Sequence, residues 1–217
     1  MIITWYGNSC FRIQEQSRDH EVALLTDPFS PEDGKKLPRS LTADIVTVSH
    51  DHPRHNHVAA VGGEPFVIEG PGEYEVKEMF ITGVGTYHDM VEGKEKGRNT
   101  IYYINVGGLH LLHLGDLNHA LGEKHVEDLH SIDILFLPVG GGDVLNAKKA
   151  QEVVDQIEPR VIIPMHYKTS GFCPKCDTAD PFLKAMGAGK LEALPKLKIN
   201  DKDLPQEEMK VIILEPQ

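Results

Sequence analysis

Four histidines lie within eight residues directly after a short apolar segment, a density that packing alone does not explain. Residues 45–48 are apolar and β-branched, which predicts an interior strand, and the histidines that follow it are His50, His52, His55 and His57. In an extended loop, residues two apart point the same way, so His50 and His52 can present their imidazoles to one point. Neutral imidazole is the commonest nitrogen ligand of zinc and similar metals. The pattern therefore indicates a metal site in the loop that leaves this strand.

The same loop resembles the H-x-H-x-D-H signature of the metallo-β-lactamase superfamily. Its sequence is His50-x-His52-x-Arg54-His55, so Arg54 stands where the signature has aspartate. Other residues follow in the order and local contexts of that family, namely Asp27, His88, Asp116 and His166. The resemblance covers nearly the whole chain and is to the compact Zn-dependent hydrolases related to ascorbate-6-phosphate lactonase. It implies an α+β fold, the αββα four-layer sandwich of this superfamily.

The resemblance also implies metal ligands and a reaction. In two-metal members, the positions that match His50, His52 and His88 hold the first metal. The second is held by positions that match Arg54, His55, Asp116 and His166. A bound metal lowers the pKa of its water to about 7 and an aspartate orients that water, so Asp116 and Arg54 are the candidate catalytic residues. The implied reaction is hydrolysis of a small ester, lactone or amide, with zinc as the expected metal (one or two ions) and manganese or iron as alternatives.

Arg54 weakens the second set of ligand positions as a metal site. A guanidinium stays protonated above pH ~12 and has no lone pair to offer a metal. A divalent ion about 5 Å from that charge would be repelled by about 7 kcal/mol at an effective dielectric constant of about 20. We therefore predict a mononuclear or impaired dinuclear site. In it, Arg54 would pair with Asp116 or bind an anionic group of the substrate.

Residues around this set have expected supporting roles. By resemblance Asp27 supports the histidine loop, the alternative being an ordinary turn aspartate before proline. His113 and His119 flank Asp116, and we expect them at most to support the ligands. Cys173 and Cys176 form a single C-x-x-C. Without a second ligand pair this favours surface thiols near the pocket over a metal or redox site.

Apolar and alternating runs predict strands at 2–6, 10–14, 22–26, 45–48, 66–69, 79–84, 100–106, 109–114, 132–139, 161–163 and 211–214. Helices are predicted at 123–130, at 147–158 with Asn146 as N-cap, and from residue 180. Residues 70–74 predict a turn, and 107–108 a tight hairpin turn. Loops 30–40 and 89–99 would border the pocket. The metal candidates thus follow strand ends on one rim.

Length and charge limit the class of protein. With 217 residues, the chain is expected to form one domain over 1–217. The formal net charge of −11, without a basic stripe, disfavours a nucleic-acid partner. No segment approaches the ~20 apolar residues that span a bilayer, and three cysteines are too few for a disulfide framework. We therefore expect a cytoplasmic protein that binds a small-molecule substrate and no membrane, and homo-oligomerisation stays open.

Three functions fit these residues. The first is a metal-dependent hydrolase, in which Arg54 helps to bind an anionic substrate. The second is a degenerate family member that binds a metal or a small ligand without catalysis, which the arginine favours. The third is redox chemistry with iron at a histidine–carboxylate site. Loops 30–40 and 89–99 carry no motif that identifies the substrate.

Overall fold

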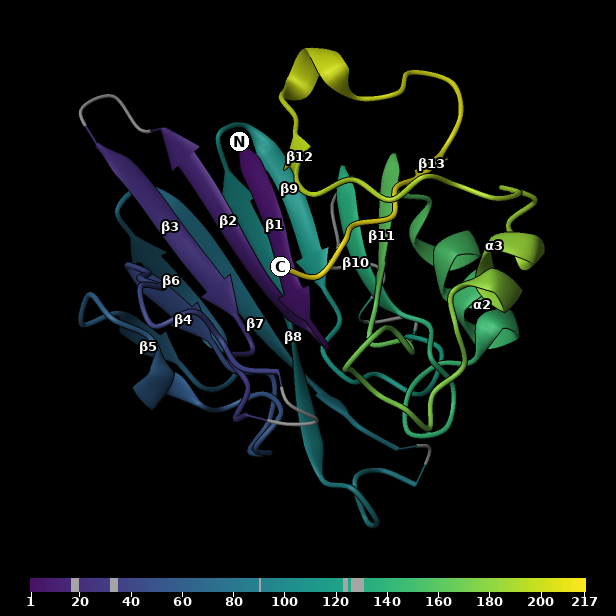
Figure 1. Cartoon of the computed structure of the whole chain (residues 1–217), viewed down its shortest axis with the longest axis horizontal. Helices are drawn as coiled ribbons and strands as arrows, with labels where there is room; N and C mark the ends of the chain where they lie inside the picture. The colour runs from purple at the N-terminus through teal and green to yellow at the C-terminus, as the bar shows by residue number, and fades with distance from the viewer. Residues whose placement is uncertain (17–19, 32–34, 90, 123–124, 126–130) are drawn as a thin grey trace.

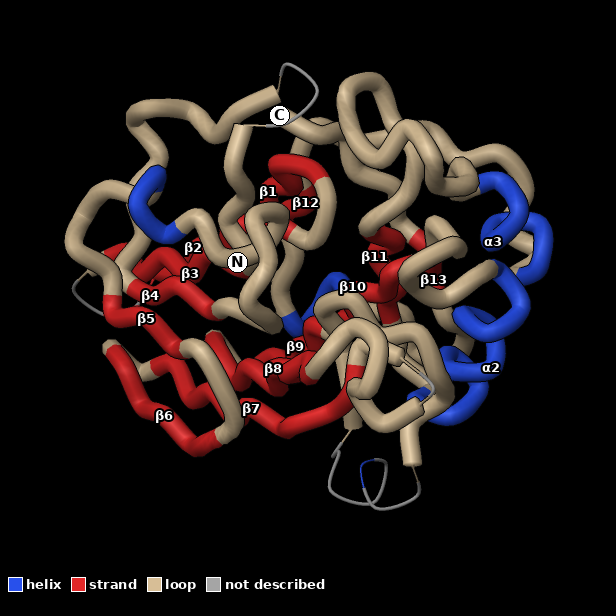
Figure 2. Tube along the Cα trace, turned by 90° about the horizontal axis from the view of Figure 1, so that it is seen from below, coloured by secondary structure: helices blue, strands red, loops and turns tan. Residues whose placement is uncertain are grey.

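Two mixed β-sheets face each other across a shared hydrophobic core (Figures 1 and 2). The computed structural model describes residues 1–16, 20–31, 35–89, 91–122, 125 and 131–217. The first sheet has the order β12 (Leu197–Lys198), β1 (Ile2–Gly7), β2 (Cys10–Gln16), β3 (Glu21–Thr26), β4 (Ile45–Thr47) and β5 (Phe66–Ile68). The second has the order β13 (Lys210–Val211), β11 (Val161–Met165), β10 (Ile134–Pro138), β9 (Leu109–His113), β8 (Arg98–Val106), β7 (Met79–Tyr87) and β6 (Gly72–Val76).

Both faces of the first sheet are buried, each in its own hydrophobic core. Neighbouring residues of a strand point to opposite faces, so they enter different cores. Leu24 of β3 and Ile45 of β4 belong to the core between the sheets. Their neighbours Leu25 and Val46 belong to a second core on the outer face. Both strands are therefore apolar at successive positions, as the sequence of 45–48 predicted.

Loops cover that outer face in the part of the chain that the structure describes. The second core includes Phe29, Leu37, Leu41 and Val61, from the segments 28–31, 35–43 and 57–62. The last of these contains the 3-10 turn η1 (Val58–Ala60). The α-helices α2 (Ala147–Ile157) and α3 (Asp180–Ala185) both lie beside the second sheet, near β11 and β13 (Figures 1 and 2). The predicted α+β sandwich is confirmed, with loops forming the outer layer of the first sheet among the described residues.

The unit β10–α2–β11 brings strand ends to one rim. Asn146 caps α2 as predicted, because its side chain accepts a hydrogen bond from the backbone N–H of Lys149. The buried stripe of the helix contains Ala150, Val153 and Val154. Strands β9, β10 and β11 are parallel, so their carboxyl ends meet at the same edge.

Some elements differ from the prediction. Residues 72–74 of the turn expected at 70–74 belong to β6, which joins β7 through Lys77 and Glu78, both with positive φ. The last strand, β13, ends at Val211 instead of extending over 211–214. The helix predicted at 123–130 lies outside the described residues, apart from position 125. No helix among the described residues is long and apolar enough to cross a membrane.

Candidate metal centre

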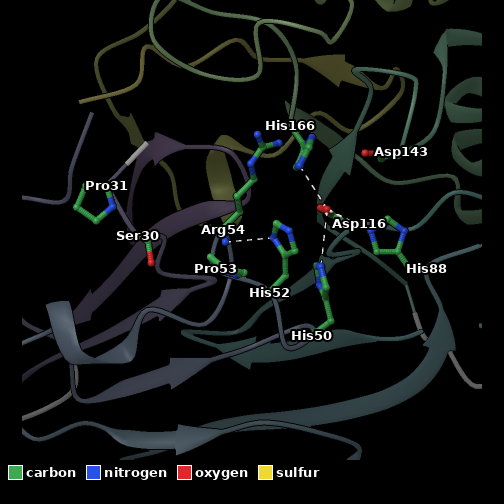
Figure 3. A pocket seen from close by; sticks show the side chains of 10 residues that line it. All are labelled: Ser30, Pro31, His50, His52, Pro53, Arg54, His88, Asp116, Asp143 and His166. Atoms are coloured by element: carbon green, nitrogen blue, oxygen red, sulfur yellow. Dashed lines mark hydrogen bonds and ion pairs between the residues drawn. The ribbon is translucent and has the colours of Figure 1, made fainter. Parts of the chain in front are cut away.

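The sequence-predicted site residues meet at the rim where several strands end (Figure 3). His50 follows β4, His88 follows β7, and His166 follows β11. They open into a cavity of about 520 Å³, lined by Ser30, Pro31, His50, His52, Pro53, Arg54, His88, Asp116, Asp143 and His166. His55 lies beneath, fully buried. Residues more than a hundred positions apart in the chain thus form one polar cluster.

The Asp116 carboxylate lies at the centre of this cluster. Its Oδ2 is 3.1 Å from His55 Nε2, 3.3 Å from His166 Nε2, 3.5 Å from His88 Nε2 and 4.0 Å from His50 Nε2. Burial alone would raise the pKa of Asp116, but His166 and His55 hold it well below its usual value. The carboxylate is therefore ionised at neutral pH.

Asp27 holds the histidine loop from below. It is fully buried and accepts hydrogen bonds from the Ser49 backbone N–H at 2.7 Å, the Ser49 hydroxyl at 2.7 Å, and His55 Nδ1 at 2.9 Å. Burial alone would lower the pKa of His55, but Asp116 and Asp27 on either side raise it to about 10. A metal ion at His55 Nε2 would therefore have to replace a proton. This network agrees with the supporting role expected for Asp27.

Ser49 orients the first histidine of the loop. Its hydroxyl hydrogen points to Asp27 Oδ2, so its oxygen can accept from His50 Nδ1, 3.0 Å away. Burial, together with the nearby His55, lowers the pKa of His50 to about 4, which keeps its ring neutral. With Nδ1 occupied, His50 presents Nε2 towards Asp116 (Figure 3).

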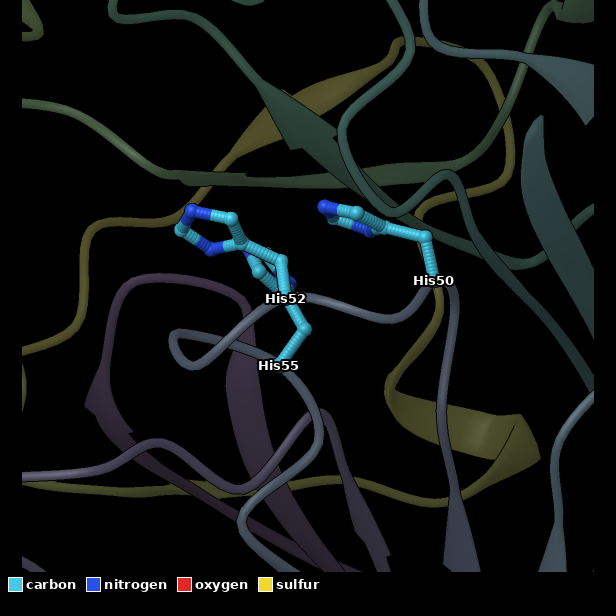
Figure 4. Close-up of side chains that lie close together, drawn as sticks. All are labelled: His50, His52 and His55. Atoms are coloured by element: carbon cyan, nitrogen blue, oxygen red, sulfur yellow. The ribbon is translucent and has the colours of Figure 1, made fainter. Parts of the chain in front are cut away.

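Among the described residues, four groups could hold a metal ion, since the ligand atoms within each group lie within 4.8 Å of one another. They are His50/His52/His55, His50/His88/Asp116, His55/Asp116/His166 and His166/Cys173/Cys176, of which the last would need its two cysteines reduced. Figure 4 shows the first group, which comes from a single loop. His52 thus lies with His50 and His55, whereas the resemblance implied that it joins His50 and His88. Among the described residues, Nε2 of His55 and of His166 is buried, and both atoms contact Asp116 Oδ2 as ion pairs, at 3.1 and 3.3 Å, without a well-aligned hydrogen bond.

Arg54 and Asp116 line the same cavity. The backbone N–H of Arg54 donates to His52 Nδ1 at 3.2 Å, and its side chain extends to the side of the pocket where His166 lies (Figure 3). Among the described residues, Asp116 forms ion pairs with four histidines. The expected pairing of Arg54 with Asp116 stays a prediction.

Comparison with known proteins places this centre in a family. The family model of the β-lactamase superfamily domain matches residues 2–166, which include every residue of the cluster. A candidate Zn-dependent hydrolase of the metallo-β-lactamase superfamily from Thermotoga maritima is 37% identical, with a TM-score of 0.78, and the match covers 98% of this chain and 97% of that one. The chain belongs to the metallo-β-lactamase superfamily.

More distant relatives agree with this assignment. A UPF0173 metal-dependent hydrolase from Methanopyrus kandleri is 29% identical over 199 residues, which cover 78% of this chain and 85% of that protein. The diiron β-hydroxylase CmlA from Streptomyces venezuelae has a TM-score of 0.60 at 14% identity, over 87% of this chain and 51% of that one, and it shows the fold alone. The prediction of a metal-dependent hydrolase of the metallo-β-lactamase superfamily is confirmed at this level.

Two residues that position Asp116 in this superfamily member were not predicted from the sequence. The Asn99 side chain accepts from the Asp116 backbone N–H at 3.1 Å and donates to the Leu114 carbonyl at 3.0 Å. Gly115 has φ +56°, and a Cβ there would lie 2.4 Å from Asn99 Oδ1. Asn99 lies in β8, but the sequence placed it at the end of the charged loop expected at 89–99, which carries no pattern. Gly115, directly before a candidate ligand, was the only available signal.

The flanking histidines contact backbone instead of the cavity. The fully buried His113 donates from Nε2 to the Ser9 carbonyl at 2.9 Å and accepts from the Gly115 N–H at 3.3 Å, so it supports the turn before Asp116. His119 Nε2 lies 3.0 Å from the carbonyl of Tyr87, the residue before His88. Both positions suit the expected supporting role.

Cys173 and Cys176 are joined by a disulfide. The interpretation of this pair as surface thiols is therefore wrong in this structure. Cys176 Sγ lies 4.0 Å from His166 Nδ1, so the C-x-x-C segment contacts the cluster directly. Cys10 is the free cysteine and is buried.

Proposed function

We propose that the protein hydrolyses a small ester, lactone or amide that carries an anionic group, using a metal ion held by the histidine–Asp116 cluster. The observation that supports this is the Asp116 carboxylate, whose Oδ2 lies 3.1 to 4.0 Å from four imidazole nitrogens. Asp116 and three of those histidines, His50, His88 and His166, line a cavity of about 520 Å³, large enough for a small molecule.

His55, Asp116 and His166 would hold the ion most directly, because Nε2 of each histidine is buried and lies within 3.3 Å of Asp116 Oδ2. His50 and His88 reach the same carboxylate and would complete the ligand set. When bound, a divalent ion lowers the pKa of its water to about 7 and polarises the scissile carbonyl. Zinc suits imidazole and carboxylate ligands, and manganese or iron are the alternatives.

The chain's own groups prepare this site. Asp27 keeps the proton of His55 on Nδ1, so that Nε2 can offer its lone pair once its own proton leaves. Ser49 does the same for His50. Asp116 stays ionised and presents an acceptor oxygen that can orient the attacking water.

Arg54 would select the substrate. It lines the cavity, and its planar guanidinium can bind a carboxylate or phosphate through two parallel hydrogen bonds. The same positive charge disfavours a second dication, since both groups around Asp116 share one carboxylate. A single tightly held ion is the expected stoichiometry.

A substrate screen tests this function. Wild type, His166→Ala and His110→Ala would be assayed against lactone, ester, thioester, phosphodiester and β-lactam substrates. His110 contacts the Ser131 carbonyl away from the cavity and is the matched control. We expect a metal-dependent activity that His110→Ala retains and His166→Ala loses. Equal rates in all three proteins would assign the activity to a contaminant or a metal-free mechanism, and no activity with bound metal would favour the non-catalytic alternative.

A further inference from the structure

We propose that Cys173 and Cys176 form a reversible redox pair that controls how tightly His166 holds a metal ion. The proposal rests on the proposed role of His166 as a ligand. It assigns a modification site next to the metal centre, with small thiols and disulfides as its reactants.

The pair is accessible from the substrate side. It lines a cavity of about 500 Å³ that shares Arg54, Asp143 and His166 with the metal pocket. Cys173 is only 7% exposed, whereas Cys176 is partly exposed. A small thiol entering the cavity would therefore reach Cys176 Sγ first.

Close packing couples the pair to His166. Cys176 Sγ is the partner of His166 Nδ1, at 4.0 Å. A Cβ on Gly140 would lie 2.1 Å from the His166 carbonyl oxygen and 3.0 Å from Cys176 Cβ, so these segments touch without spare room. The next residue, Asp177, donates its N–H to the Gly140 carbonyl at 2.7 Å. The cysteine loop is thus fixed against the strand end that carries the histidine.

The redox state changes which hydrogen bond His166 can make. A disulfide sulfur carries no hydrogen and can only accept, so it stabilises the tautomer with the proton on Nδ1 and a lone pair on Nε2, against the Asp116 carboxylate 3.3 Å from Nε2, which stabilises the opposite one. A reduced Cys176 thiol can instead donate its S–H to Nδ1. The imidazole proton then moves to Nε2, where it competes with the metal. Reduction should therefore weaken metal binding.

Reduction needs two equivalents of a small thiol. The first, as thiolate, attacks Cys176 Sγ; the bond to Cys173 breaks, and Cys173 leaves as a thiolate that takes up a proton. The second attacks the mixed disulfide, which releases Cys176 as a thiol and forms one external disulfide. Two electrons pass from the small thiols to the protein, and an oxidised small disulfide reverses the reaction.

The experiment compares wild type in both states with a variant that cannot change state. Wild type is treated with oxidised glutathione or with a phosphine reductant, and the reagent is removed. Alkylation of the unfolded chain, followed by mass spectrometry, should add one label to the oxidised protein, at Cys10, and three to the reduced protein. Zn²⁺ affinity is then measured by competition with a chromophoric chelator. The control is Cys173→Ser/Cys176→Ser after the same treatments.

We expect the reduced wild type to bind Zn²⁺ about tenfold more weakly than the oxidised form, the lower end for loss of a partner that orients a ligand. The double variant should give one affinity after both treatments. Equal or tighter binding by the reduced protein would overturn the proposal, as would an extra zinc equivalent that the double variant lacks, or a pair that does not cycle. Absence of zinc binding in both states would instead remove the proposed metal site, and this inference with it.

Discussion

Asp27 Oδ2 lies 2.9 Å from His55 Nδ1, and neither side chain is exposed to solvent. The opposite nitrogen of the same imidazole lies 3.1 Å from Asp116 Oδ2. One buried histidine therefore links a carboxylate that supports the loop to the carboxylate at the centre of the cluster. Because Asp27 accepts only, it fixes the proton on Nδ1.

Replacing Asp27 by asparagine, a side chain of nearly the same volume, should weaken metal binding. In Asp27→Asn the amide can still accept from the Ser49 N–H, but its NH₂ would face His55 Nδ1 and favour the opposite tautomer. We expect metal affinity to fall about 10- to 100-fold, measured by chelator competition. Asp44→Asn removes a carboxylate elsewhere in the first sheet and should leave affinity unchanged. Unaltered affinity in a folded Asp27→Asn protein would show that His55 does not bind the metal.

Asp44, the control position, should make the stability of the fold depend on pH. Burial alone would raise its pKa, but Lys77 and the Ala23 backbone N–H outweigh this and lower it. A lowered folded-state pKa stabilises the fold above the unfolded pKa of about 4, and this stabilisation is lost as pH falls through the folded-state pKa. Asp44→Asn should therefore cost about 1 kcal/mol at pH 7. Denaturant titrations at pH 7 and pH 2.5 would check it, and an equal difference at both pH values would contradict it.

Gly115→Ala should destabilise the fold more than an equivalent change at another left-handed glycine. Gly115 has a positive φ, which alanine adopts only with strain, and the added Cβ would also lie 2.4 Å from Asn99 Oδ1, which is a clash. Gly108 has φ +78° with no atom within 4 Å of such a Cβ, so it isolates the conformational term. We expect about 1 kcal/mol for Gly108→Ala, and 1 to 3 kcal/mol more for Gly115→Ala. If calorimetry found similar losses of stability in Gly115→Ala and Gly108→Ala, the turn before Asp116 could accommodate the added Cβ by a small shift.

Sequence patterns predicted the parts of the fold that local chemistry determines. Residues 147–158 have a polar N-cap and one apolar stripe, and both appear in α2. The hairpin across 107–108 pairs β8 with β9 as expected. The histidines and Asp116 also lie together at strand ends, because parallel strands bring distant segments to one edge.

Features that depend on tertiary contact could not be predicted in this way. β6 was missed because its turn uses Lys77 and Glu78 at positive φ instead of glycine or asparagine. Asn99 bonds to the backbone of Leu114 and Asp116, which are distant in the chain. The Cys173–Cys176 bond depends on how the loop after β11 folds, and the spacing of the two cysteines allowed thiols equally well.

Arg54 should affect substrate binding more than turnover. Arg54→Met keeps an unbranched side chain but removes the charge and the paired donors. For an anionic substrate we expect KM to rise about 10- to 100-fold, since hydrogen bonds to charged groups contribute about 1.5 to 3 kcal/mol, with a smaller change in kcat. A neutral analogue of the same substrate is the control and should show little change. Equal effects on both substrates would rule out recognition of the anion.

Metal content per chain tests the central claim, that the histidine–Asp116 cluster of this superfamily member holds a metal ion beside Arg54. Wild type and Arg54→Asp would be dialysed against metal-free buffer after loading with zinc and analysed by mass spectrometry. We predict about one equivalent in the wild type, because the cluster has one central carboxylate and a nearby guanidinium. Arg54→Asp should raise the content towards two. Two equivalents in the wild type would contradict the role assigned to Arg54, and no metal in either protein would contradict the metal centre itself.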